Sequence, residues 1–121
     1  EMRGVTASPA YDVPVRTAEI ANETARVLGV APTFSAKDVI NYPDFVGEGY
    51  GIPSAAGNEA VRLLARTEGV IVDPIYSGKC ASAMIAHIRA GHFTKDDVVV
   101  FVHTGGTPAI FTWSKLWLSP T

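Results

Sequence analysis

Two short segments of this 121-residue chain combine residue types that can do chemistry on a small molecule. The first is Asp73-Pro74-Ile75-Tyr76-Ser77-Gly78-Lys79, and the second is His103-Thr104-Gly105-Gly106-Thr107-Pro108. Phenols and hydroxyls donate and accept hydrogen bonds, and glycines at a helix start leave backbone amides open to an anionic group. Since both segments follow apolar stretches, they predict a site for a flat or anionic small molecule at the ends of two strands.

Each segment alone also has a simpler explanation. A Gly-Gly pair after a strand is often only a tight turn, and a tyrosine beside a helix start often only packs. We expect Asp73 to fix the turn with Pro74 in the same way. A third segment, Gly47-Glu48-Gly49-Tyr50-Gly51-Ile52-Pro53, favours the functional interpretation because its glycines predict a loop of unusual backbone shape around a second tyrosine.

The spacing of apolar residues predicts the elements that must position these loops. Helices are expected over about residues 15–28, 56–68 and 78–90, ended by Gly29, Gly69 and Gly91. Strands are expected over residues 2–7, 39–40, 70–72 and 98–102. This alternation favours an α/β fold with three α/β/α layers and a mostly parallel sheet. The carboxyl ends of residues 70–72 and 98–102 would then bring both segments to one edge of the sheet.

Composition restricts the classes of function. With 47% apolar and 18% charged residues, the chain 1–121 fits a single globular domain and not a disordered tail. A net charge of −2 with scattered basic residues argues against a nucleic-acid partner. No apolar run approaches the ~18 residues that span a bilayer and no signal peptide opens the chain, so we expect no membrane partner and a cytoplasmic location. One cysteine, Cys80, fits a reducing compartment, and no cluster has metal-ligand spacing, so no metal is expected.

In order and spacing, several blocks resemble the last third of D-cysteine desulfhydrases and 1-aminocyclopropane-1-carboxylate (ACC) deaminases. These are fold-type-II pyridoxal-phosphate enzymes, built like the tryptophan synthase β subunit. The resemblance implies that residues 1–121 are the C-terminal part of a cofactor-binding domain, and that the cofactor is pyridoxal 5'-phosphate. It is closest over residues 39–111, and its blocks are Gly49-Tyr50-Gly51-Ile52-Pro53, Glu59-Ala60-Val61-Arg62, Thr67-Glu68-Gly69-Val70, Asp73-Pro74-Ile75-Tyr76-Ser77-Gly78-Lys79 and Phe101-Val102-His103-Thr104-Gly105-Gly106-Thr107-Pro108-Ala109.

The same resemblance implies roles for the residues of the loops. Tyr76 would lie against the cofactor ring as a candidate acid or base, with stacking alone as the alternative. Tyr50 would lie near the substrate, or would only hold its loop. Thr104 would be the partner of the pyridine nitrogen, with Ser77 and Gly105 also in the cofactor site. Because a neutral hydroxyl makes the ring a weaker electron sink than a carboxylate would, Thr104 suits β-elimination. The deaminase branch has a glutamate where this chain has Ser77.

The resemblance therefore implies a lyase that performs β-elimination on a small D-amino acid such as D-cysteine, giving pyruvate, sulfide and ammonia. ACC deaminase is the enzymatic alternative, and a non-catalytic α/β module that binds a small ligand is the alternative of another class. In the family the Schiff-base lysine lies upstream of this region, with the phosphate loop, and Lys79 does not correspond to it. We therefore expect this chain alone to be inactive. Another portion or chain would complete it, and the complete enzyme would be a homodimer.

Overall fold

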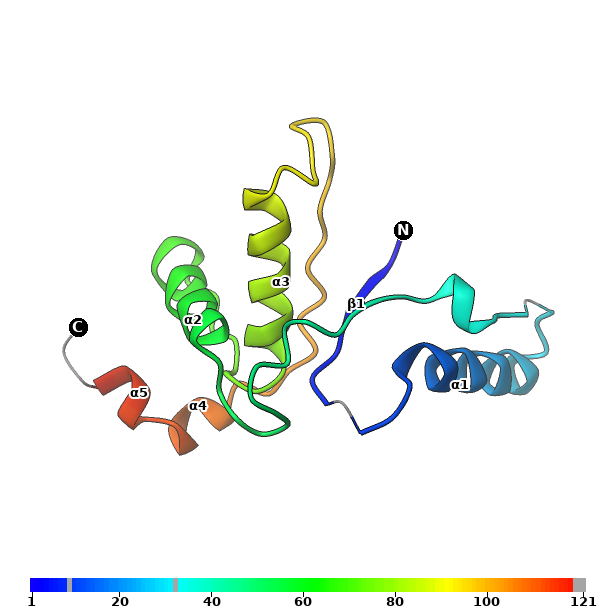
Figure 1. Ribbon diagram of the computed structural model, residues 1–121, viewed down its shortest axis with the longest axis horizontal. Helices are drawn as coiled ribbons and strands as arrows, with labels where there is room; N and C mark the ends of the chain where they lie inside the picture. The colour runs from blue at the N-terminus through cyan, green and yellow to red at the C-terminus, as the bar shows by residue number, and fades with distance from the viewer. Residues whose placement is uncertain (9, 32, 119–121) are drawn as a thin grey trace.

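The computed structural model describes residues 1–8, 10–31 and 33–118. Helix α2 packs against α3, whereas α1 lies to one side and contacts η1 and β2 (Figure 1). In chain order the elements are β1 (Arg3–Val5), α1 (Val13–Leu28), the 3-10 helix η1 (Ala36–Asp38), β2 (Ile40–Tyr42), α2 (Ala55–Glu68), α3 (Ser77–Arg89), α4 (Ala109–Thr112) and α5 (Lys115–Leu118).

The three long helices confirm the prediction made from the apolar spacing, and the ends of these helices follow ordinary capping rules. The Asp12 carboxylate accepts a hydrogen bond from the Val15 amide at 3.2 Å, so α1 begins two residues earlier than predicted. The Ser54 hydroxyl caps α2 by accepting from the Gly57 amide at 3.1 Å. At the other end of α2, Gly69 has a φ of 66°, which is a left-handed C-cap that glycine adopts without strain.

The sheet is a pair of parallel strands. Arg3 lies opposite Ile40 and Val5 lies opposite Tyr42, and the Thr6 amide extends the pairing with a bond to the Tyr42 carbonyl at 3.0 Å. The first predicted strand and the short strand near residue 40 are therefore confirmed. Because parallel strands need a long crossover, α1 and η1 form the connection between them.

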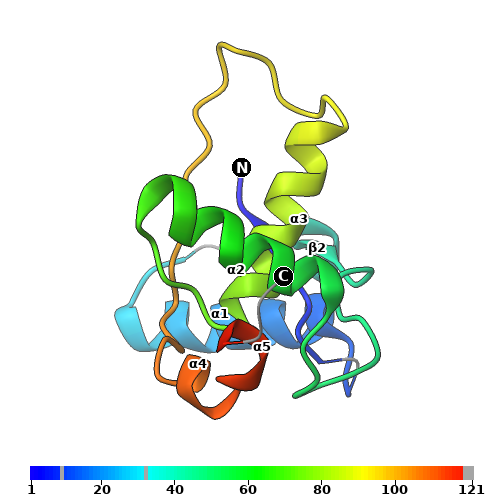
Figure 2. The same ribbon diagram turned by 90° about the vertical axis from the view of Figure 1, so that its left-hand side faces the viewer.

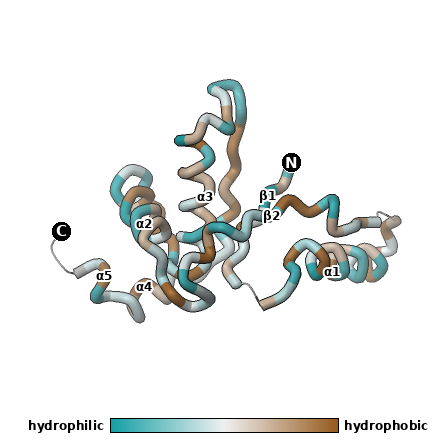
Figure 3. Tube along the Cα trace, in the orientation of Figure 1, coloured by the Kyte–Doolittle hydropathy of each residue, from teal (hydrophilic) through white to brown (hydrophobic). Residues whose placement is uncertain are grey.

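The two other predicted strands, over residues 70–72 and 98–102, are wrong for this structure, because neither forms a strand among the described residues. The chain returns along 98–102 from the far end of α3 to the level of its first turn (Figures 1 and 2), and this apolar stretch is brown in Figure 3. Val98 and Val100 are 90% and 78% exposed. The sequence pattern is that of a buried strand, but a strand forms only where a neighbour pairs with its backbone, and no described segment does so.

The core lies between α2 and α3 and beneath the turn that joins them. Ala60, Val61 and Ala81 are buried there with Val72 and Ile75. At the start of α3, a Cβ on Gly78 would lie 2.5 Å from the Asp73 carbonyl and 3.0 Å from Val61 Cγ2. Only a glycine allows this approach, so the α2–α3 packing and the Asp73 turn depend on each other.

Helices α4 and α5 continue from the His103 segment toward α2. The Arg62 guanidinium of α2 donates to the Leu116 carbonyl of α5 at 2.6 Å and lies over the Trp117 ring. Helices around a parallel strand pair make this an α/β structure, in agreement with the predicted class. No helix within the described ranges has the length and apolar character needed to cross a membrane.

Candidate functional site

The turn that leads into α3 is built on one buried carboxylate, Asp73. Its Oδ2 accepts from the amides of Ile75 and Tyr76, both at 2.8 Å. Its Oδ1 accepts from the Ser77 amide at 2.8 Å and from the Ser77 hydroxyl at 2.5 Å. Burial alone would raise the pKa of this carboxyl, but the hydrogen bonds from Ser77, Tyr76 and Ile75 outweigh it and hold the pKa below its usual value. The ionised carboxylate therefore fixes the backbone of Tyr76, as expected for a turn-forming aspartate.

The His103–Pro108 segment packs directly on this turn. The Ile71 carbonyl is 3.0 Å from His103 Nε2 and accepts from the Thr107 hydroxyl at 3.2 Å. Because His103 Nδ1 accepts from the Gly105 amide at 3.0 Å, the neutral ring carries its proton on Nε2 and donates it to Ile71. Both ring nitrogens of His103 thus hold backbone groups, those of Ile71 and Gly105, so this side chain has a structural role.

A close approach between Gly106 and Asp73 joins the two segments. A Cβ on Gly106, whose φ is 88°, would lie 2.6 Å from Asp73 Oδ1. The Ser77 hydroxyl also lies 3.4 Å from the Gly105 carbonyl, a long contact. The structure thus brings the Tyr76 and Thr104 loops side by side, as the predicted site requires.

The phenols of Tyr50 and Tyr76 meet at the surface of the chain. Their hydroxyls are hydrogen-bonded, and the rings are edge to face with centroids 6.0 Å apart. The hydrogen bond to Tyr50 is the largest cause that raises the pKa of Tyr76. Since 57% of Tyr50 and 45% of Tyr76 are exposed, both remain accessible to a ligand.

The other predicted site residues differ in how far they are exposed. Thr104 is exposed, and its hydroxyl makes no hydrogen bond within the described part of the chain. Gly105 has a φ of 98° and open space where a Cβ would be. Ser77 is 2% exposed and its hydroxyl is engaged by Asp73, so it lies beneath the site and not at its surface. Whether these residues hold a cofactor stays a prediction.

Lys79 was not predicted to take part in the site, yet the structure connects it to Tyr50. It is fully buried, and its ammonium donates to the carbonyl of Gly49, the residue before Tyr50, at 2.9 Å. Burial lowers the pKa of this amine. No local sequence signal could have indicated a contact between residues 30 positions apart.

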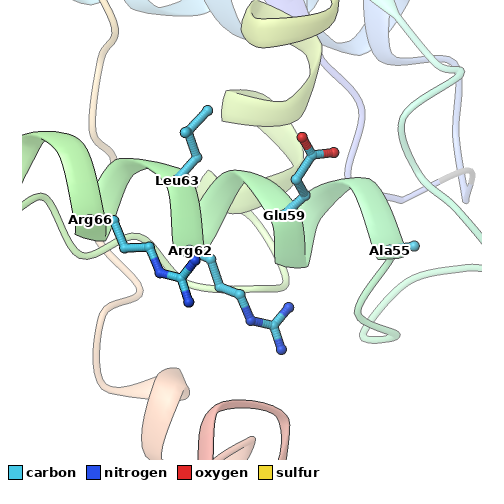
Figure 4. Close-up of a pocket in the computed structure, with 5 residues that line it drawn as sticks. All are labelled: Ala55, Glu59, Arg62, Leu63 and Arg66. Atoms are coloured by element: carbon cyan, nitrogen blue, oxygen red, sulfur yellow. The ribbon is translucent and has the colours of Figure 1, made fainter. Parts of the chain in front are cut away.

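A shallow pocket of about 280 Å³ lies elsewhere, on one face of α2 (Figure 4). None of the predicted site residues lines it; its residues are Ala55, Glu59, Arg62, Leu63 and Arg66. Within residues 1–8, 10–31 and 33–118, no group of three His, Cys, Asp or Glu side chains is arranged to hold a metal ion.

Known proteins resemble this chain in sequence and in fold. It is 37% identical over 113 residues to D-cysteine desulfhydrase from Salmonella schwarzengrund (strain CVM19633), and 36% identical over the same length to that from Salmonella paratyphi C (strain RKS4594). Both alignments cover 93% of this chain and 34% of the relative, so the chain spans about a third of the length of these relatives. The crystal structure of an ACC deaminase homologue, 24% identical, shares the fold with a TM-score of 0.69 over 95% of this chain and 35% of that one.

The family assignment depends on a match along most of the chain. Residues 3–105 match the family described as pyridoxal-phosphate dependent enzyme. The match includes β1, all three long helices, the Tyr50 and Tyr76 loops, and Thr104. The chain therefore belongs to the pyridoxal-phosphate dependent enzyme family.

Proposed function

We propose that this chain is the C-terminal part of a pyridoxal-phosphate lyase that catalyses β-elimination from a small D-amino acid such as D-cysteine. The observation that carries the proposal is the accessible Tyr50–Tyr76 phenol pair, in which Tyr76 belongs to the turn that contacts the His103-Thr104-Gly105-Gly106 loop through Asp73 and Ser77. The two relatives described above are named D-cysteine desulfhydrase, which supports the same substrate class.

The residues around the phenol pair fit one edge of the cofactor. Tyr76 offers an exposed ring, Thr104 an unengaged hydroxyl, and Gly105 open space at its Cα. Tyr76 would pack on the pyridine ring and Thr104 would bond its nitrogen, while Ser77 would support Tyr76 from below through Asp73. When bound, the cofactor would withdraw electrons from the substrate's α-carbon and so make the α-proton easier to remove, and the electron pair left behind would expel the β-substituent.

Tyr76 is suited to holding a proton near the leaving group. A phenol has an ordinary pKa near 10, so Tyr76 carries its proton at neutral pH and could donate it to a departing thiolate. The hydrogen bond to Tyr50 raises the pKa of Tyr76 further, so the proton stays on the phenol until the leaving group accepts it. Tyr50, hydrogen-bonded to it at the surface, would orient this proton and contact the substrate. The pair would thus assist elimination and leave abstraction of the α-proton to the Schiff-base lysine.

Position 77 favours elimination over opening of a cyclopropane ring. It carries no carboxylate, and the Ser77 hydroxyl is already bonded to Asp73. The neutral Thr104 would then be the partner of the ring nitrogen. A neutral hydroxyl such as that of Thr104 would suit a reaction in which the leaving thiolate takes the negative charge with it.

We also propose that the chain works in the cytoplasm with a portion that supplies the Schiff-base lysine and the phosphate loop, and that the complete enzyme is a homodimer. Alone it would be inactive. The exposed apolar side chains Val98, Val100, Val102 and Phe111, at 69–90% exposure, support a covering partner. The relatives are about three times as long as this chain, so they contain further segments that could cover these side chains.

The test is an assay of the assembled protein, in which this chain is joined to that portion. Sulfide and pyruvate should form from D-cysteine, with little 2-oxobutanoate from ACC. Tyr76→Phe should lower kcat by about 100-fold, whereas Tyr11→Phe, which changes another exposed tyrosine, should leave it unchanged. Ammonia and 2-oxobutanoate from ACC as the main products would favour the deaminase, and no reaction with either substrate would favour a ligand-binding module.

A further inference from the structure

Lys79 is a buried cation that no step of the proposed function uses. It lies in the first turn of α3, with 0% of its surface exposed. Among the described residues its ammonium makes one hydrogen bond, to the Gly49 carbonyl, and no carboxylate forms an ion pair with it. Burying an ammonium without an opposite charge is costly, so a neutral residue of the same shape would suit the core better. The burial therefore needs a reason other than packing.

The path of the side chain suggests that reason. The Lys79 stem crosses the first turn of α2, where a Cβ on Gly57 would lie 3.7 Å from Lys79 Cγ. Beyond α2 it reaches the middle of the 47–53 loop. Gly47 and Gly51 in this loop have φ values of 71° and 75°, so its backbone uses conformations that glycine makes accessible. A loop so rich in glycine has high conformational entropy when it is not held.

Its contact point is the residue directly before Tyr50. A hydrogen bond from a charged donor is stronger than one between neutral groups, and this one fixes the Gly49 carbonyl at 2.9 Å. The Tyr50 phenol meets Tyr76, whose backbone is separately fixed by Asp73. One tyrosine of the pair is thus held by the turn, and the other depends on the loop.

We propose that Lys79 is a positioning residue, which holds the Gly49 carbonyl and thereby keeps the Tyr50 phenol against Tyr76. This inference rests on the proposed function only where it takes the Tyr50–Tyr76 pair to have a catalytic role. Its structural part concerns this chain alone.

The test is a titration of the tyrosine phenols in the full chain by NMR, with 13C at each Cζ. Wild-type Tyr76 should titrate above the ordinary value of about 10, and Tyr50→Phe should lower its pKa by removing the hydrogen bond. Lys79→Met, which keeps the length of the side chain but removes the donor, should lower the pKa of Tyr76 in the same direction. Lys95→Met removes an exposed lysine and should leave it unchanged.

The direction of the change separates this role from a simple effect of charge. Losing a nearby positive charge makes a phenolate harder to form and raises the pKa of Tyr76. Release of Tyr50 from its hydrogen bond with Tyr76 instead lowers the pKa of Tyr76. A Tyr76 pKa that rises or stays at its wild-type value in Lys79→Met, with native circular dichroism, overturns the proposal.

A second measurement needs no variant, so it can test the proposal even if Lys79→Met does not fold. It asks whether the Lys79 ammonium is buried and held by its hydrogen bond. In 15N NMR of the wild-type chain, the Lys79 ammonium should give a separate signal whose protons exchange slowly with water, because it is buried and bonded. Exchange as fast as that of the exposed Lys95 would overturn the proposal.

In the assembled enzyme, Lys79→Met should lower kcat by about 10- to 100-fold when Tyr50 is present, and should have no further effect in a Tyr50→Phe background. Additive losses would contradict a role through Tyr50. If the titration changes as expected but no lyase activity is found, the proposed function fails and the role of Lys79 stands. If the enzyme is active and the titration is unchanged, only the role of Lys79 fails.

Discussion

Replacement of the buried Asp73 by asparagine should destabilise the chain far more than the same replacement at an exposed aspartate such as Asp44. The side chain keeps its shape, but one of its two oxygens becomes an NH2 donor. Each carboxylate oxygen of Asp73 accepts two hydrogen bonds. Oδ2 accepts from the amides of Ile75 and Tyr76, and Oδ1 accepts from the amide and the hydroxyl of Ser77. In either orientation of the amide, at least one backbone N–H then faces a donor and loses its acceptor.

The size of the loss follows from these bonds. A hydrogen bond to a charged group contributes roughly 1.5–3 kcal/mol, and a buried donor left unsatisfied costs about 1–3 kcal/mol. With one or two bonds lost and the others no longer charge-assisted, the free energy of unfolding should fall by about 3–5 kcal/mol. Total stabilities of domains are about 5–15 kcal/mol, so the variant should be close to unfolding.

Urea unfolding of the full chain, followed by circular dichroism at pH 7, measures this difference. Asp44→Asn is the control, because Asp44 is exposed. The pKa of Asp73 is lowered on folding, so its contribution is present above the unfolded pKa of about 3.9 and is lost as the pH falls through the folded pKa. The difference in the free energy of unfolding between the wild type and Asp73→Asn should therefore become smaller below about pH 4. A loss under about 1 kcal/mol at pH 7, or a gap that widens in acid, would refute the reasoning.

Three further predictions concern the same region. Gly106→Ala should cost about 1–3 kcal/mol more than Gly105→Ala in urea unfolding, since both glycines have positive φ but only the methyl at position 106 meets Asp73; equal costs would show that the contact is unimportant. Ser54→Ala should lower stability by about 1 kcal/mol through loss of the α2 cap, and an unchanged urea midpoint would count against it. In the assembled enzyme, Thr104→Val should lower kcat by more than it raises KM, because it removes the hydroxyl but keeps the shape; a change in KM alone would argue against contact with the cofactor ring.

The helices could be predicted because their signals are local. The apolar spacing lies within each helix, and the glycines at positions 29 and 69 directly follow the helix ends that they define. The role of Asp73 in its turn could be predicted for the same reason, since its partners lie within four positions. The resemblance to pyridoxal-phosphate enzymes was also carried by short ordered blocks, and the family match confirms it.

That residues 70–72 and 98–102 form no strand in the described part of the chain could not be predicted from such signals. An apolar run indicates that a segment would be stable if covered on both faces, but it does not supply the neighbour that pairs with it. Val98 and Val100 therefore remain exposed, and none of the described segments pairs with their backbone as a strand. The Lys79–Gly49 contact and the approach of Gly106 to Asp73 depend on tertiary packing across about 30 positions, which the local sequence does not encode.

The most direct test of the central claim is a crystal structure of the assembled protein with pyridoxal 5'-phosphate bound. We expect Thr104 Oγ1 at hydrogen-bond distance, about 2.8 Å, from the pyridine nitrogen, with the Tyr76 ring against the cofactor and the Tyr50 phenol on the substrate side. A cofactor bound away from the junction of these two loops, or a pyridine nitrogen whose partner is a carboxylate, would contradict it.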